Sequence, residues 1–170
     1  MKNLILFLLL LCPFSLMAGE IDDVFGSGIF GTVWGQTPNE ILKVYPSGKK
    51  QESYGAYRIT VKDGREILSL DRPKDGELVF VFDTQDRLFS VGVTFGSEDD
   101  YAKLMQKLDT LFGGRDNLEN DIGATGLIWK DDKTKLKLLY VPGMFSGETM
   151  LSIEHLSLPK NNKSKEELGF

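Results

Sequence analysis

The chain has 170 residues, and its 20 Lys and Arg against 25 Asp and Glu give a formal net charge of −5. No stripe of Lys and Arg with interleaved aromatic residues occurs, which argues against nucleic acid and against an anionic membrane surface as partners. One cysteine, Cys12, and one histidine, His155, are too few ligands for a usual zinc site, so no metal or cofactor is predicted.

Residues 1–18 have the order of a secretory signal peptide. Lys2 is followed by the apolar run Leu4–Leu11 and then by small residues, with cleavage predicted after Ala18. The apolar run is shorter than the roughly 20 residues that a membrane span needs. A lipoprotein anchor on Cys12 is disfavoured, because a bulky leucine precedes it and a proline follows. We therefore expect an exported protein, periplasmic or secreted, without a cysteine in its processed form.

The first elements after the signal are short. Residues 19–28 are expected to be a flexible lead-in and 29–35 a first strand. Thr37 as N-cap, Pro38 at the first helical position and Glu40 three residues after the cap predict a short helix that ends before Pro46. Residues 49–55 are expected to form a polar connection.

The run WGQTPNEILKVYP, residues 34–46, resembles the start of some small exported bacterial domains: outer-membrane assembly factors of the BamE type and β-lactamase-inhibitor-like proteins. There a glycine, a Thr or Ser cap and an apolar helix precede a meander, so the resemblance implies strands after this helix. The second helix that those domains place before the strands is missing, and the chain is assigned to neither family.

The middle of the chain predicts two hairpins. Residues 56–62 are expected to pair with 66–71 through a turn at Asp63–Gly64, a strong local hairpin signal. After a second turn at 72–76, the continuous apolar run at 78–82 predicts a central strand, and 83–86 a turn. In the next strand four residues are expected to face the core: Phe89, Val91, Val93 and Phe95.

The long amphipathic helix at 98–112 is the clearest element of the second half. Ser97 is its predicted N-cap, Asp100 completes a capping box and Gly113 ends the helix. A polar loop at 115–123, strands at 125–130, 135–141 and 148–158, and a disordered tail at 159–170 are expected to follow.

The two halves share a strand–helix–three-strand plan. GTVWG at 31–35 aligns with GVTFG at 92–96, and residues 56–70 align with 124–138. The predicted fold is therefore α+β: one domain over 29–158, an antiparallel β-sheet meander with two helices packed on one face. Two pseudo-repeats of β-α-β-β-β are expected at about 29–83 and 86–158.

Catalytic motifs are scarce. His155 is expected in the last strand on the side of Leu151 and Ile153, and no G-x-S-x-G motif accompanies it. The leading hypothesis is a small non-enzymatic domain that binds a protein or an envelope component. The alternatives are a carboxylate-dependent hydrolase and a small-molecule carrier with its ligand between sheet and helices. The candidate binding residues are aromatic or apolar and lie near turns: Tyr54, Tyr57, Trp129, Met144 and Phe145.

Overall fold

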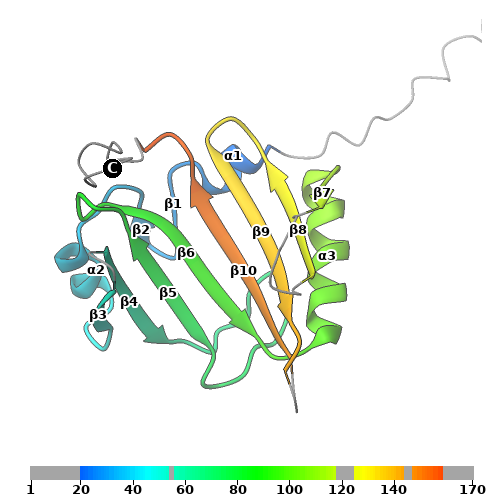
Figure 1. Cartoon of the computed structure of the whole chain (residues 1–170), viewed down its shortest axis with the longest axis horizontal. Coiled ribbons are helices and arrows are strands. Elements are labelled where there is room, and N and C mark those ends of the chain that lie inside the picture. The colour runs from blue at the N-terminus through cyan, green and yellow to red at the C-terminus, as the bar shows by residue number, and fades with distance from the viewer. Residues whose placement is uncertain (1–19, 54–55, 118–124, 144–146, 159–170) are drawn as a thin grey trace, which may run out of the picture.

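The structure is a computed structural model that describes residues 20–53, 56–117, 125–143 and 147–158 (Figure 1). The predicted signal peptide and the predicted C-terminal tail lie outside these residues. None of the described helices is long and apolar enough to cross a membrane.

One antiparallel sheet dominates the fold, as the sequence predicts. Its strand order is β3-β4-β5-β6-β10-β9-β8-β7 (Figure 1). On one side are β3 (Lys49–Ser53), β4 (Ala56–Lys62), β5 (Glu77–Phe82) and β6 (Leu88–Phe95); on the other are β7 (Asp116–Asn117), β8 (Thr125–Lys130), β9 (Thr134–Val141) and β10 (Glu148–His155). Each group of four is a meander, and the two meanders join where β6 pairs with β10.

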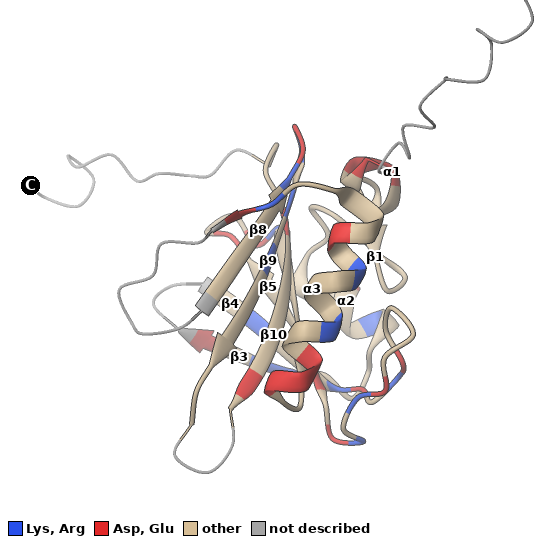
Figure 2. Ribbon diagram, turned by 90° about the vertical axis from the view of Figure 1, so that its right-hand side faces the viewer, with Lys and Arg blue, Asp and Glu red and all other residues tan. Residues whose placement is uncertain are grey.

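The described helices all lie on the same face of this sheet (Figure 2). They are α1 (Ile21–Phe25), α2 (Pro38–Val44) and α3 (Glu98–Phe112). α2 contacts β4, α3 contacts β9 and β10, and α1 contacts β9. The prediction of two helices on one face is confirmed for α2 and α3. α1 was not expected, because its five residues carry two aspartates and only one fully buried side chain, Ile21.

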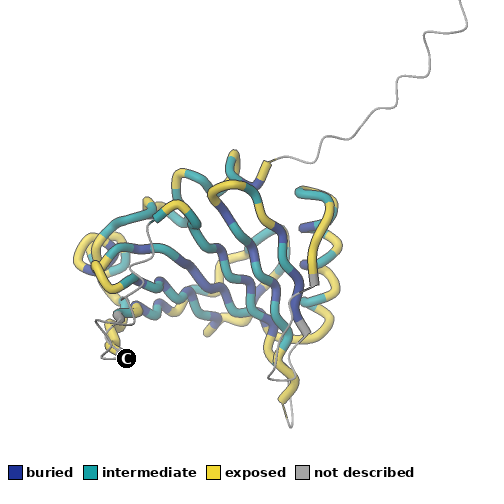
Figure 3. Tube along the Cα trace, turned by 45° about the horizontal axis from the view of Figure 1, so that its top comes forward, coloured by how far each residue is buried: buried dark blue, intermediate teal, exposed yellow. Residues whose placement is uncertain are grey.

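The core lies between the helices and the sheet. Buried and partly exposed positions alternate along most strands (Figure 3), as in β5, where Leu78, Phe80 and Phe82 are buried. Leu104 and Leu108 of α3 complete this layer from the helix side. β5 is an interior strand, as expected, but only one of its faces is buried.

Local chemistry explains where α2 and α3 begin. The Thr37 amide donates to Glu40 Oε2 at 2.8 Å, and the Ser97 amide donates to Asp100 Oδ2 at 3.0 Å. These are the two capping boxes that the sequence predicts. α3 ends at Gly113, whose φ of 78° is unfavourable for residues with a Cβ. Thr149 Oγ1 then donates to the Ser97 carbonyl oxygen at 2.6 Å and connects the α3 cap to β10.

The N-terminal prediction of one strand over 29–35 is wrong. Two short strands, β1 (Gly28–Ile29) and β2 (Thr32–Val33), form a small separate hairpin. The turn between them places Phe30 at φ 55° and Gly31 at φ 77°, which reverses the chain instead of extending it. The expected flexible lead-in contains α1 and the start of this hairpin.

The predicted hairpin of 56–62 with 66–71 is also wrong. β4 pairs with β5 on one side and with β3 on the other. Residues 49–53, expected to be a connection, form the edge strand β3, whose sequence KKQES suits an edge because charged side chains discourage pairing with another chain. In the segment 66–71 only an isolated bridge between Ile67 and Leu70 forms.

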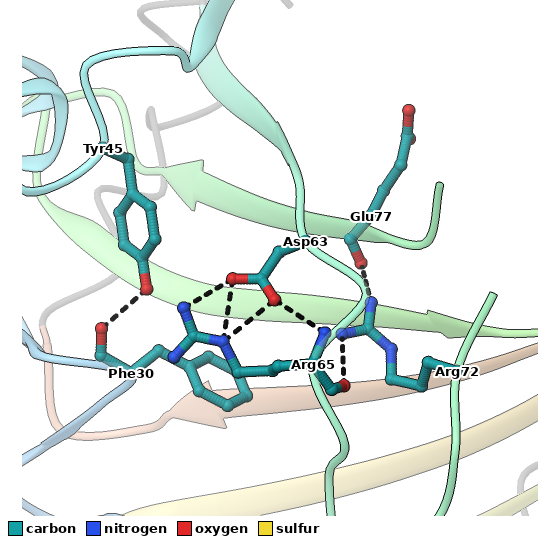
Figure 4. Close-up of polar contacts among 6 residues, drawn as sticks. All are labelled: Phe30, Tyr45, Asp63, Arg65, Arg72 and Glu77. Carbon is teal, nitrogen blue, oxygen red and sulfur yellow. Dashed lines mark hydrogen bonds and ion pairs between the residues drawn. The ribbon is translucent and has the colours of Figure 1, made fainter. Parts of the chain in front are cut away.

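Arg72 holds residues 63–76, the excursion between β4 and β5, against the sheet (Figure 4). It is 7% exposed, and its Nε donates to the Thr94 carbonyl at 2.9 Å while an Nη donates to the Glu77 carbonyl at 2.8 Å. Nearby, Arg65 pairs with Asp63 at the end of β4. The long-range bond from Arg72 to Thr94 competes with the local turn signal of Asp63–Gly64, and the chain returns to the sheet only at Glu77.

A β-bulge in β6 changes the expected facing of Phe89. Val81 of β5 pairs with Ser90, whereas Phe82 pairs with Leu88, so Phe89 is the extra residue. Leu88 enters the core and is fully buried, while Phe89 is only partly buried. The prediction holds for Val91, Val93 and Phe95, which are buried.

The predicted pseudo-repeats are not confirmed. Their alignment places residues 66–70 on β9, but 66–70 form no strand of the sheet. The alignment also equates β5 with β10. In the strand order, however, β6 and not β5 is the counterpart of β10 across the centre of the sheet. The observed symmetry is that of strand order alone, with four consecutive strands on either side of the β6–β10 pair.

Candidate binding surface

The sheet face opposite the helices is the candidate site, and we call it the open face. No described helix covers it (Figure 2). Its side chains come from the strand positions that alternate with the core. At its centre lie Val79, Val81, Ser90, Gly92, Thr94, Met150, Ser152 and Glu154; toward its sides lie Arg58, Thr60, Ile128, Lys135, Lys137 and Leu139.

Small residues occupy the middle of the open face. Gly92 stands between Val79 and Ser152 in the strand register, and Ser152 Oγ is 3.1 Å from Ser90 Oγ. A Cβ at Gly92 would make only ordinary van der Waals contacts with Val79, so a steric clash does not explain why this position is a glycine. Aliphatic side chains, Val79 and Met150 among them, border this low centre. Gly92 is nevertheless buried and Ser90 is only 5% exposed, so little of the backbone is exposed at this centre.

An ion network crosses β9 and β10 beside the centre. Glu154 Oε2 lies 2.7 Å from Lys135 Nζ, and Glu154 Oε1 lies 2.5 Å from Lys137 Nζ. Burial raises the pKa of Glu154, but hydrogen bonds from the two lysines lower it more, and the net shift is downward. Two ammonium groups against one carboxylate leave a net positive charge on this part of the face.

The open face ends in a groove of about 460 Å³ at the β5–β6 turn. Val81, Phe89 and Leu158 supply apolar walls, and Lys135, Lys137 and Glu154 form the polar side. The β6 bulge is what places Phe89 here. This groove therefore combines an aromatic ring, aliphatic surface and two cations in one place.

Two of the predicted binding residues, Trp129 and Tyr57, lie on the core side of the sheet. Trp129 is 1% exposed, and its indole Nε1 donates to Asp109 of α3 at 3.2 Å, so it packs beneath the helix and presents no surface. Tyr57 packs against the core with Lys50 Nζ 3.7 Å above its ring. Tyr54, Met144 and Phe145 lie outside the described residues.

His155 lies at the end of β10, as expected, with its ring centroid 5.6 Å from that of Trp34. Burial lowers its pKa; the charge of Asp22 raises it and that of Lys133 lowers it, with a net downward shift. Its Nδ1 is buried without a hydrogen-bond partner among the described residues. His155 lies beside aromatic and charged groups, and no carboxylate of the described residues is hydrogen-bonded to it to orient it as a general base.

The hydrolase alternative requires a pair of carboxylic acids in a pocket. One pocket of about 410 Å³ is lined by Glu20, Asp22, Asp131 and Asp132. There the Asp22 amide donates to Asp131 Oδ2 at 3.1 Å, and the Lys133 amide donates to Asp22 Oδ2 at 3.2 Å. Both carboxylates thus bind backbone amides and connect α1 to the β8–β9 turn. Among the described residues, no group of three His, Cys, Asp or Glu side chains is placed to hold a metal ion.

The sequence did not single out the residues of the open face as candidates, because they occupy ordinary strand positions. The alternation of Lys135 and Lys137 with Leu136 and Leu138 signals a cationic face of β9. The sequence does not show that Glu154 meets both lysines, since that depends on the β9–β10 register. No family model matches the sequence, and no curated protein or solved structure matches the chain.

Proposed function

We propose that the protein is an exported, non-enzymatic binding domain whose open face contacts a protein of the cell envelope. The observation that carries the proposal is the one-sided sheet: the described helices bury one face, while the opposite face has a low, small-residue centre and an adjoining groove. The signal-like order of residues 1–18 motivates the envelope as its location.

The size of the open face suits a protein partner. Eight strands at about 4.8 Å spacing extend about 34 Å, and six residues of strand extend about 20 Å. The resulting area, roughly 700 Å², is close to the roughly 800 Å² that one partner buries in a standard interface. A small metabolite would use only a fraction of this face.

The chemistry of the open face also suits a protein. Aliphatic side chains such as Val79 and Met150 surround the small centre, and charged residues such as Arg58 and Lys130 stand nearer the sides. Aliphatic and small polar side chains thus mix at the centre, and a mixed apolar and polar surface with a polar rim is usual for a non-obligate protein–protein interface. The net positive charge around Glu154 favours a partner whose matching surface is acidic.

Photo-crosslinking in the source cell tests this proposal. A photoreactive amino acid is placed at Val79 or Ser152 on the open face, or at the exposed Ala102 on α3 as control. We expect one discrete envelope protein to be crosslinked from both open-face positions and not from position 102. Crosslinking from position 102 alone, or equally from all three, would contradict the proposal.

A steric variant then tests the contact itself. Ser152→Arg fills the low centre and removes the contact with Ser90, at a cost to stability of about 1 kcal/mol. We expect the affinity for the crosslinked partner to fall at least about tenfold, whereas Ala102→Arg leaves it unchanged. A folded Ser152→Arg protein with undiminished affinity would show that the partner binds elsewhere.

A further inference from the structure

A second groove lies on the helix side of the sheet, away from the open face. It has a volume of about 520 Å³ and runs between α3 and the excursion that connects β4 to β5. Leu68, Ser69 and Leu70 form one wall, and Lys103, Lys107 and Leu111 of α3 form the other. This volume falls within the range of pockets that bind small ligands.

The loop wall of this groove is held in an unfavourable conformation. Leu68 has φ 53° and Ser69 has φ 55°, a left-handed region that residues with a Cβ rarely adopt, least of all two in succession. Hydrogen bonds between the backbones of Ile67 and Leu70, 3.2 and 3.0 Å long, close the turn around them. Strain of this kind concentrates at binding sites.

The helix wall presents two cations above an apolar surface. Lys103 and Lys107 are one turn apart, where like charges repel each other. Within the described part of the chain, neither ammonium group has a hydrogen bond or an ion pair. Leu111, one turn further along, is 44% exposed. An anion at Lys103 and Lys107 would relieve the repulsion, and an apolar group would cover Leu111.

We propose that this groove binds a fatty acid through its carboxylate. The two ammonium groups hold the carboxylate, and the alkyl chain lies between Leu68, Leu70 and Leu111. A fatty acid suits the lining better than a peptide. The α3 backbone is bonded within the helix and Ile67 and Leu70 bond each other, so on the backbone of these two walls a peptide would find partners only at Leu68 and Ser69.

Titration of the purified full chain with dodecanoate, below its micelle concentration, tests the proposal by two-dimensional amide NMR. We expect saturable shifts at 68–70 and 103–111 and none at the open face. Acetate supplies the carboxylate without the chain, and dodecyltrimethylammonium supplies the chain with the opposite charge. Neither should reproduce the dodecanoate shifts at the same concentration.

Charge-neutralising variants complete the test. Lys103→Gln with Lys107→Gln should weaken dodecanoate binding about tenfold, because two exposed ion pairs are lost. Lys43→Gln with Lys74→Gln removes the same charge from exposed positions that do not line the groove and should leave the affinity unchanged. Equal weakening by both double variants, equal binding of the cationic amphiphile, or shifts located elsewhere would overturn the proposal. The absence of saturable binding would overturn it as well.

Discussion

Replacement of Arg72 by methionine should destabilise the fold far more than the same change at Arg65. Arg72 is 7% exposed and bonds the carbonyl oxygens of Thr94 and Glu77 at 2.9 and 2.8 Å. Methionine retains most of the side-chain volume but donates no hydrogen bond, so both carbonyls lose a charged donor. Arg65 instead pairs with Asp63 at the surface, where 48% of its side chain is exposed.

The magnitude follows from the two buried bonds. A hydrogen bond to a charged group contributes about 1.5–3 kcal/mol, and recovery of the desolvation cost of the guanidinium offsets part of the loss. We expect Arg72→Met to lower the free energy of unfolding by about 3 kcal/mol and Arg65→Met by at most about 1 kcal/mol. Arg72→Lys should recover little, because a point charge on a flexible stem does not reproduce the planar donor fork.

Equilibrium urea unfolding, followed by tryptophan fluorescence and by circular dichroism, measures these differences. Coincident transitions with the two probes justify a two-state treatment. Equal losses in the Arg72 and Arg65 variants, or a loss below about 1 kcal/mol for Arg72→Met, would refute the reasoning that Arg72 fixes the excursion to the sheet.

Three further predictions concern single contacts. Asp109→Ala should lower the free energy of unfolding by about 1–2 kcal/mol and shift the tryptophan fluorescence, because the buried Trp129 indole N–H loses its acceptor. Asp109→Asn retains an acceptor and should be less destabilised. Urea unfolding of both variants compares them. Asp100→Ala should cost about 1 kcal/mol in a thermal melt and more than Ser97→Ala, since the Asp100 carboxylate receives the amides of both Gly96 and Ser97. Glu154 has a pKa lowered below 4.5 in the folded chain, so its contribution to stability is present above pH 4.5 and is lost as the pH falls through the folded pKa. Melting temperatures of the unmodified protein and of Glu154→Gln should therefore differ at pH 7 and converge at acid pH, and a constant difference would contradict this.

Elements defined by neighbouring residues could be predicted from the sequence. The caps at Thr37 and Ser97 act within one helical turn, so α2 and α3 were located correctly. The alternation in 125–130 and 135–141 likewise defined β8 and β9, whose hairpin closes through the short connection at 131–133.

Elements that depend on distant residues could not be predicted from the sequence. The local turn signal at Asp63–Gly64 predicted a hairpin with 66–71, but the pairing of β4 with β5 and the Arg72 contacts decide the path of that segment. The β3 edge, the bulge at Phe89 and the burial of Trp129 also depend on partners from other parts of the chain.

The sequence by itself determined the fold class, the two capped helices and most of the strands, because these rest on periodicity and on contacts within a few residues. Only the tertiary structure decided which strands are neighbours, which sheet face the helices leave open, and how Lys135, Lys137 and Glu154 meet on it. The physical reason is that a side chain's face follows from its own strand, whereas its neighbours across the sheet follow from a register that the whole core sets.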